Sequence, residues 1–240
     1  MTEELMGVEY LLKTYLSQKG YITFARQQIW TGKQYSDIDV LGAKPLKGII
    51  HFGECKTYGG AGDVVVIDPS IETNGGFIKY WLNERGSFIQ NIERLFNDKY
   101  ENEWIFDLIH VPKNNVKLIE VTFCGNIWIA PKDRKKCNEA FQDDLRKRLT
   151  LTKSIPKSVK VTGSICSTFD LITTIMSDVR KERQDWGKRY GDIFLDIIRE
   201  FWRFISPEST GWVGVGHSRK EEIAKVSRKE LEKVLMEKNK

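Results

Sequence analysis

Helix-like and strand-like hydrophobic patterns alternate over roughly the first 170 residues of this chain, and this alternation limits the folds open to it. Residues 3–18 carry apolar side chains within one arc of a helix, and Gly20 follows as a stop signal. Residues 35–41 and 48–57 are predicted to be two strands of a hairpin. The alternation continues with helices expected at 77–100 and 133–149 and strands at 117–123, 126–130 and 158–166. This order favours an α/β fold.

The pattern becomes helical after residue 168. Residues 192–205 place apolar side chains on one wide face, whereas residues 218–240 carry only a thin apolar seam. We therefore predict an α/β core over residues 1–168 and a helical C-terminal extension over residues 169–240. A thin seam packs either on the body of its own chain or on a second subunit, so a homodimer is one of two expectations.

Composition excludes several classes of protein. The chain has 240 residues, 40% of them hydrophobic and 30% charged, which allows a sizeable core and argues against disorder. Lys and Arg number 38 against 33 Asp and Glu, a net charge of +5 that is compatible with a polyanionic partner without requiring one. No apolar run approaches the roughly 20 residues of a membrane span, and no signal-peptide pattern is present. We expect a soluble, cytoplasmic protein of prokaryotic type with no membrane partner.

Acidic residues and a lysine fall where the two hairpin strands would bring them together. Side chains alternate between the faces of a strand. The alternation predicts Asp37, Asp39 and Leu41 on one face, Ile38 and Val40 on the other, and Glu54 with Lys56 on one face of the second strand. If the strands are neighbours, Asp39, Glu54 and Lys56 converge at one edge of the sheet.

Two carboxylates and an ammonium in this arrangement suit phosphoryl chemistry. Carboxylate oxygens are ligands for Mg²⁺ or Mn²⁺, and a bound cation neutralises phosphate charge and acidifies its water. The ammonium of Lys56 can orient or help to deprotonate the attacking water. A lysine that acts as a base needs a pKa lowered by burial, which only a structure can show.

The run D-I-D-V-L-G at residues 37–42, followed by G-E-C-K-T at 53–57, resembles the PD-(D/E)xK nuclease superfamily. Within this superfamily, the residue pattern is most similar to the Mrr-like and archaeal Holliday-junction-resolvase-like branches. The resemblance implies a restriction-endonuclease-like core with a central mixed β-sheet flanked by helices. It implies that Asp39 is the motif aspartate and that Glu54 and Lys56 form its E-x-K. Glu9 corresponds to the glutamate that the family often carries on the preceding helix.

The same resemblance implies the activity, a Mg²⁺-dependent endodeoxyribonuclease in which Mn²⁺ substitutes for Mg²⁺. Asp39, Glu54 and Glu9 would bind the metal, and Lys56 would complete the catalytic set. No proline precedes Asp39, Asp37 competes for the metal role, and Gln90 is the candidate for a glutamine on the helix after E-x-K. The residues singled out for contact with DNA are Tyr58, Lys33, Lys135 and Lys136, against the alternative of an ordinary turn and a solvated helix face.

Three functions stay open from the sequence. A nuclease of restriction, repair or junction-resolving type is the expectation that the resemblance favours. A non-catalytic DNA-binding or assembly module that retains the nuclease fold is the main alternative. A metal-dependent enzyme acting on RNA or on a small phosphorylated molecule is the third. The four widely spaced cysteines are expected to be reduced structural thiols rather than zinc ligands.

Overall fold

The structure, a computed structural model, describes residues 7–56, 65–67, 87–130, 132–151, 154–181, 192, 194–198 and 229. The chain divides into two compact units, Met1–Leu171 and Ile172–Lys240. Helix α6 (Thr168–Lys181) begins in the first unit and ends in the second. The apolar seam predicted at 218–240 falls almost entirely outside the described residues. No helix among the described residues is both long and apolar enough to span a membrane.

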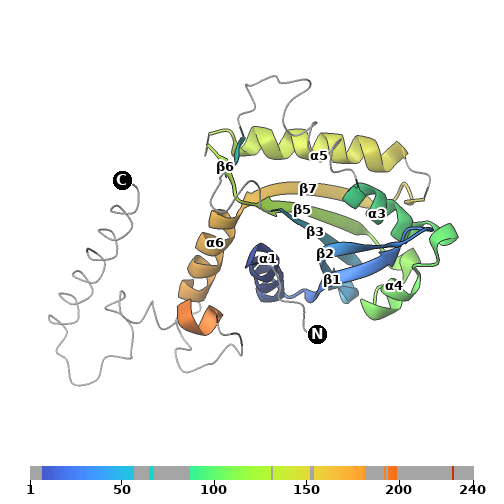
Figure 1. Cartoon of the computed structure of the whole chain (residues 1–240), viewed down its shortest axis with the longest axis horizontal. Coiled ribbons are helices and arrows are strands. Elements are labelled where there is room, and N and C mark those ends of the chain that lie inside the picture. The colour runs from blue at the N-terminus through green and yellow to red at the C-terminus, as the bar shows by residue number, and fades with distance from the viewer. Residues whose placement is uncertain are drawn as a thin grey trace. The chain divides into compact units, whose positions relative to one another are not determined.

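A mixed five-stranded sheet forms the centre of the first unit, with strand order β1-β2-β3-β5-β7 (Figure 1). Strands β1 (Ile22–Trp30), β2 (Tyr35–Lys44) and β3 (Ile49–Lys56) pair antiparallel. Strands β5 (Leu118–Gly125) and β7 (Lys160–Ser167) continue the sheet parallel to β3. The α/β class and the mixed sheet flanked by helices are therefore confirmed.

The remaining elements connect or cover these strands. Helix α1 (Gly7–Gln18) precedes β1, and α3 (Ser87–Phe96) with the short α4 (Trp104–Leu108) lies between β3 and β5. Helix α5 (Arg134–Leu151) connects to β7. The smaller elements are β4 (Val65–Ile67), β6 (Ile127–Ile129) and the 3₁₀ turns Pro45–Lys47, Asp98–Tyr100 and Lys113–Asn115. Strands β4 and β6 pair parallel in a separate small sheet.

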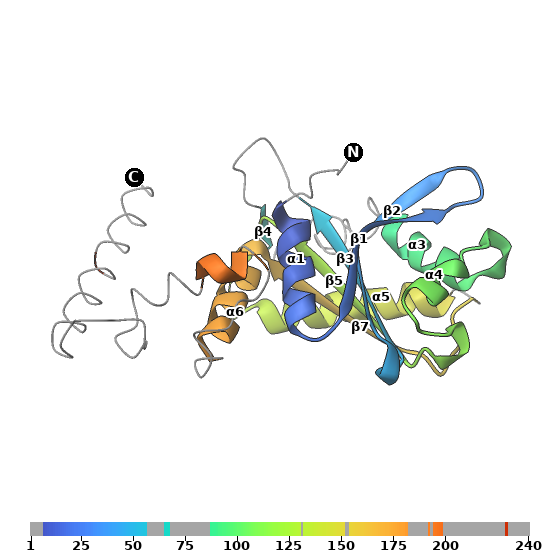
Figure 2. The same ribbon diagram turned by 90° about the horizontal axis from the view of Figure 1, so that it is seen from below.

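Helices cover both faces of the sheet, with α1 on one face and α5 on the other (Figures 1 and 2). On the α5 face, Phe141 and Leu145 enter a core cluster with Phe52 from β3. On the α1 face, Leu12 is fully buried and packs so closely on β3 that a Cβ at Gly53 would lie 2.4 Å from its Cδ2 atom. Truncation of such a buried leucine to alanine costs about 2–5 kcal/mol. The glycine beside Glu54 therefore allows α1 to sit directly against the strand.

Two sequence-based boundaries are corrected by the pairing. Strand β2 was expected to end at Leu41, but it continues through Gly42 to Lys44 because both neighbouring strands pair with these residues. The two strands expected around Gly125 belong to different sheets, since β5 pairs with β3 and β7 whereas β6 pairs with β4. Of the helix expected at 77–100, the structure describes Ser87–Phe96, and residues 77–86 lie outside the described part.

Candidate functional site

Strand β2 separates from β3 at Asp39, and this divergence creates the candidate site. The β2–β3 pairs run from Lys44↔Ile49 to Val40↔Gly53 and stop there. The β1–β2 pairs continue beyond this point as far as Trp30↔Tyr35. The β1–β2 hairpin therefore leaves the sheet while β3 continues beside β5 (Figure 2). We call the region between Asp39 and the last three residues of β3, Glu54 to Lys56, the fork.

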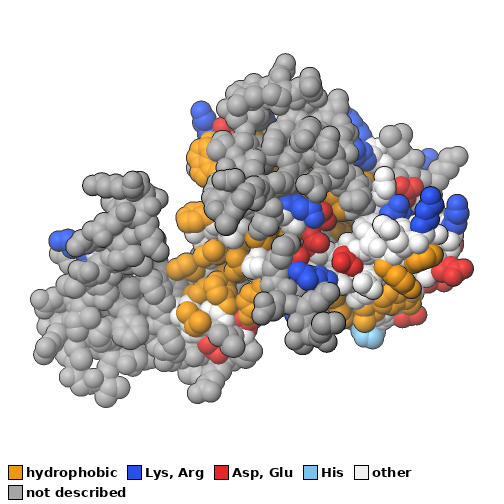
Figure 3. Space-filling view, in the orientation of Figure 1, with side chains coloured by type: hydrophobic (Ala, Val, Ile, Leu, Met, Phe, Trp, Pro, Cys, Tyr) orange, Lys and Arg blue, Asp and Glu red, His pale blue; other side chains and the backbone are white. Residues whose placement is uncertain are grey.

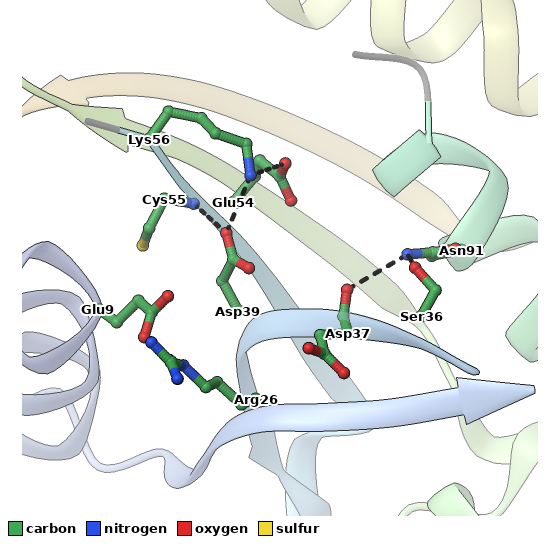
Figure 4. A network of polar contacts seen from close by, with 9 residues as sticks. All are labelled: Glu9, Arg26, Ser36, Asp37, Asp39, Glu54, Cys55, Lys56 and Asn91. Carbon is green, nitrogen blue, oxygen red and sulfur yellow. Dashed lines mark hydrogen bonds and ion pairs between the residues drawn. The ribbon is translucent and has the colours of Figure 1, made fainter. Parts of the chain in front are cut away.

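The carboxylate of Asp39 bridges the fork. Its Oδ2 accepts a hydrogen bond of 2.7 Å from the backbone N–H of Cys55 (Figure 4). Buried backbone donors need partners, and a diverging strand no longer offers its carbonyl groups to β3. The side chain of Asp39 takes over this function, so that its carboxylate is held against β3 and directed toward Glu54 and Lys56.

Lys56 lies between two carboxylates. Its Nζ is 2.7 Å from Oε1 of Glu54 and 3.6 Å from Oδ2 of Asp39. Only 7% of the Glu54 side chain and 15% of the Asp39 side chain are exposed, against 26% for Lys56. The three side chains that the sequence predicted to converge are thus brought together, with the lysine as the most accessible member.

The pKa of Lys56 decides which of its two predicted roles this arrangement favours. Burial by itself lowers the pKa of Lys56, but the charges and hydrogen bonds of Glu54, and then of Asp39, raise it above its ordinary value. The lysine is therefore an ammonium ion at neutral pH. The lowered pKa that a base would need is absent, and the arrangement favours a cation that orients water or stabilises negative charge.

Glu9 reaches the same region from α1, but it is paired with an arginine. The Glu9 side chain is 3% exposed, and its Oε2 lies 3.0 Å from Nε of Arg26 on β1. In the view of Figure 4, Asp39 lies between the Glu9–Arg26 pair and the Glu54–Lys56 pair. The structure places Glu9 beside the fork and adds Arg26 as a partner that the sequence analysis did not identify.

The electrostatics of Cys55 show that the three carboxylates share one neighbourhood. Burial raises the pKa of the Cys55 thiol, and the charges of Asp39, Glu9 and Glu54 raise it further. Such a thiol stays protonated and unreactive. All four cysteines are free, and Cys124 likewise has a raised pKa, because it is hydrogen-bonded to Cys166 and buried. The prediction of reduced thiols agrees with this state.

The predicted alternation of side chains fails at Asp39. Ile38 was expected on the face opposite Leu41, but both belong to the same core cluster. Val40 lies on the other face, 3.1 Å from the position of a Cβ at Gly53. The cause is a local backbone distortion: Arg26 has a φ of 49°, and the β1–β2 pairing skips the level of Arg26 and Asp39. Strand alternation holds only while the ladder is regular.

This distortion separates Asp37 from Asp39. The Asp37 side chain is exposed, and its backbone carbonyl accepts a hydrogen bond of 3.3 Å from Nδ2 of Asn91 on α3 (Figure 4). The same Nδ2 donates to Oγ of Ser36 over 2.9 Å. The structure therefore places Asp39, and not Asp37, in contact with Lys56.

Asn91 is a positioning residue that the sequence analysis missed. It is 3% exposed, and Nη1 of Arg94 donates to its Oδ1 over 3.1 Å. Gln90, the residue named from the sequence, is exposed and accepts from Nη2 of Arg94 over 3.3 Å. A signal for Asn91 was present, since it is a polar residue on the otherwise apolar face of α3 with Phe88, Ile92 and Leu95. Nothing in the sequence indicated that the backbone of Arg26 would adopt a positive φ.

Three of the residues predicted to contact DNA, Lys33, Lys135 and Lys136, lie on other parts of the fold than the fork. Lys33 lies exposed in the β1–β2 turn, and Lys135 and Lys136 lie exposed in the first turn of α5. Lys135 has its Nζ 3.9 Å from Oε1 of Glu139, which offsets its charge. Tyr58 lies outside the described residues. In the view of Figure 3, Lys and Arg side chains stand on several parts of the surface rather than in one patch.

The donor set fits a divalent cation only in part. Within the described ranges, no group of three or more His, Cys, Asp or Glu side chains is arranged to hold a metal ion. Asp39 and Glu54 do offer two hard oxygen donors at one edge, a number with which Mg²⁺ is commonly bound when water completes its coordination. Their present counter-ion is the ammonium of Lys56. Glu9 would add a third carboxylate after release from Arg26.

No family model, no curated protein and no solved structure matches this chain.

Proposed function

We propose that this protein is a Mg²⁺-dependent endodeoxyribonuclease that hydrolyses phosphodiester bonds in DNA. The observation that carries the proposal is the fork, where two carboxylates and an ammonium from adjacent strands meet at the point where β2 leaves β3. Lys56 lies 2.7 Å from Glu54 and 3.6 Å from Asp39 there. The proposed core is restriction-endonuclease-like, with Asp39 and Glu54–Lys56 in the places of the D…E-x-K motif. Restriction, repair and junction resolution are the three settings in which such an enzyme acts.

Each side chain of the fork has a role in this proposal. Asp39 and Glu54 would hold Mg²⁺ or Mn²⁺, with Glu9 as a further carboxylate. A bound cation would supply neutralisation of phosphate charge and a more acidic water. Lys56, as an ammonium, would orient the attacking water and stabilise the negative charge that develops on the phosphate. The hydrogen bond from the Cys55 amide would keep the Asp39 carboxylate aimed into the fork.

Cleavage of supercoiled plasmid and linear duplex, with Mg²⁺, Mn²⁺ or EDTA, tests the proposal. We expect Asp39→Ala and Lys56→Ala to lose activity by a factor of about 100 or more. Lys47→Ala removes an exposed lysine at the opposite end of the β2–β3 pair and serves as the matched control. Wild-type cleavage by folded Asp39→Ala protein would exclude the proposed site.

Asp37→Asn makes a second comparison on the same strand. Because the Asp37 carboxylate is exposed and directed away from Lys56 in Figure 4, we expect this variant to retain activity within about threefold of wild type. A loss equal to that of Asp39→Ala would move the metal role to Asp37 and contradict the assignment.

A non-catalytic DNA-binding or assembly module is the second candidate. Two observations favour it: both fork carboxylates are already paired with Lys56, and Glu9 is already paired with Arg26. Fluorescence anisotropy with labelled duplexes and four-way junctions separates the candidates. Binding that is independent of metal, without cleavage of any substrate, would replace the nuclease proposal with this one.

A further inference from the structure

We infer that Arg26 is a positioning residue that controls access of a divalent cation to Glu9. Its guanidinium holds the Glu9 carboxylate when no metal is bound and competes with the cation for it. The inference rests on the proposed function, because it requires a cation to bind at the fork. It extends that function by naming a residue outside the D…E-x-K pattern that sets the affinity for the cation.

The backbone of Arg26 is the first observation. Its φ of 49° lies in the left-handed region, which is unfavourable for a residue other than glycine. The β1–β2 ladder contains Ala25↔Val40 and Gln27↔Ile38 but skips the level between them, where Arg26 and Asp39 lie. A strained conformation inside a strand persists only when surrounding interactions require it. The contact of the Arg26 side chain with Glu9 is one such interaction.

The contact with Glu9 is the second observation. Nε of Arg26 lies 3.0 Å from Oε2 of Glu9, and Figure 4 shows the arginine reaching from β1 toward α1. Glu9 is 3% exposed, whereas Arg26 is 27% exposed. A carboxylate buried to this degree needs a cationic partner. Of the two residues, Arg26 has access to solvent and can withdraw along its flexible stem, while Glu9 is enclosed.

The balance of charge is the third observation. Arg26 and Lys56 place two positive charges beside the carboxylates of Glu9, Asp39 and Glu54. Exchange of the guanidinium for one divalent cation raises the charge of this cluster by one unit. Removal of the guanidinium without exchange makes the cluster more negative by one unit. Such a cluster attracts a divalent cation more strongly than the wild-type cluster does.

Mn²⁺ titration of the full-length protein, followed by isothermal calorimetry, tests the inference without any measurement of activity. Arg26→Gly is the main variant, because glycine adopts a φ of 49° without strain while the guanidinium is lost. We expect it to bind Mn²⁺ about tenfold more tightly than wild type. Arg26→Lys, which keeps the charge, should stay within about threefold of wild type.

Two further variants show whether Arg26 acts through Glu9. Glu9→Gln should bind Mn²⁺ about tenfold more weakly than wild type, because a carboxylate ligand is lost. The double variant Arg26→Gly/Glu9→Gln should bind no more tightly than Glu9→Gln alone. Lys33→Ala removes an exposed positive charge from the same hairpin and is the control for a general charge effect. Its affinity should stay within about twofold of wild type.

A conservative variant is the control for loss of structure. Arg26→Gln is neutral but still donates hydrogen bonds, so the buried Glu9 keeps a partner, and circular dichroism checks the fold of each protein. Wild-type or weaker Mn²⁺ affinity in folded Arg26→Gly and Arg26→Gln would overturn the inference. The proposed function would survive that result if Asp39→Ala abolishes Mn²⁺ binding. Equal titrations of wild type and Asp39→Ala would instead remove the metal site and the inference together.

Discussion

Two polar clusters lie along strand β3, and only one of them has the arrangement of a site. At the fork, Lys56 joins Glu54 and Asp39 where β2 has left the sheet. Earlier in β3, His51 has its Nδ1 3.3 Å from Oε2 of Glu120, and the Tyr21 hydroxyl donates to the same oxygen. Both clusters combine a carboxylate with a basic group, so the residue types alone do not distinguish them.

The difference lies in the backbone around each cluster. His51 sits in an intact ladder, opposite Gly42 on β2 and Glu120 on β5, and the Tyr21 ring packs edge-on against it with centroids 5.5 Å apart. His51 is 6% exposed. At the fork the ladder has ended, and the Asp39 side chain takes the place of a backbone acceptor. In the regular ladder the backbone groups pair with each other, whereas at the diverging strand the Asp39 carboxylate accepts from a backbone N–H and lies beside Lys56. Exposure does not distinguish the clusters, since the Glu120 side chain is 27% exposed and the Glu54 side chain 7%.

The largest expected effect is on the rate of DNA cleavage, and it compares a lysine of the fork with a lysine near the His51–Glu120 cluster. Lys56→Met should lower the rate of DNA cleavage by about 100- to 1,000-fold, because the cation that stabilises charge at the fork is lost. Lys44→Met removes the ammonium 4.0 Å from the Tyr21 ring and should change the rate by less than about twofold. The rates are measured on linear duplex with Mg²⁺. Equal effects of both substitutions would show that the fork has no special role.

The next effect is on stability, and it concerns the His51–Glu120 cluster rather than the fork. His51→Ala should lower the free energy of unfolding by about 1–3 kcal/mol, because a buried hydrogen bond to Glu120 is lost. Cleavage should stay within about threefold of wild type. Urea denaturation measures the change, with His110→Asn as an exposed control that tolerates the left-handed backbone of this position. A loss of activity without a loss of stability would place His51 in the site.

A smaller effect tests the strain at the fork. Arg26→Gly and Arg26→Ala both remove the guanidinium, but alanine is strained at a φ of 49°. We expect Arg26→Gly to be more stable than Arg26→Ala by about 1 kcal/mol in urea denaturation. Equal stability would mean that the backbone relaxes freely and that the distortion opposite Asp39 is not imposed by its surroundings.

The smallest effect is a pH dependence of stability that arises from the His51–Glu120 cluster. The hydrogen bond from His51 lowers the pKa of Glu120, and the Tyr21 hydroxyl adds to this effect against the opposing influence of burial. The resulting stabilisation is complete above the unfolded pKa of about 4.3 and is lost as the pH falls through the lower folded pKa. Urea midpoints between pH 3 and 7 should therefore depend less on pH in Glu120→Gln than in wild type. The difference should stay below about 1 kcal/mol, because 27% of the side chain is exposed. Identical pH profiles would contradict the lowered pKa.

Much of the fold was predictable because it depends on local patterns. Helix α1 (Gly7–Gln18) lies within the helix predicted at residues 3–18, and the run around Glu54 became a strand antiparallel to the one carrying Asp39. The meeting of Asp39, Glu54 and Lys56 followed from strand pairing, since Asp39 and Glu54 lie directly beyond the last β2–β3 pair, Val40↔Gly53. Pairing between two strands close in sequence survives in the structure, whereas the alternation of side chains in β2 fails at Asp39.

The positions of Ile38, Asn91 and Arg26 were not predictable in the same way. Ile38 changes face because the ladder is distorted at Asp39, at the level of Arg26, whose side chain contacts Glu9 on α1. Asn91 becomes relevant only when α3 packs on β2 and brings its amide to the Asp37 carbonyl. These are contacts between segments distant in sequence, which no local pattern encodes.

The order of residues by itself determined which charged groups this protein carries on adjacent strands and where helices lie along the chain, because hydrophobic periodicity acts over a few residues. Only the tertiary structure decided that Asp39 rather than Asp37 meets Lys56, that Lys56 is charged, and that Glu9 is held by Arg26. The physical reason is that protonation, ion pairing and backbone strain depend on distance and burial, and both arise only when the separate elements pack together.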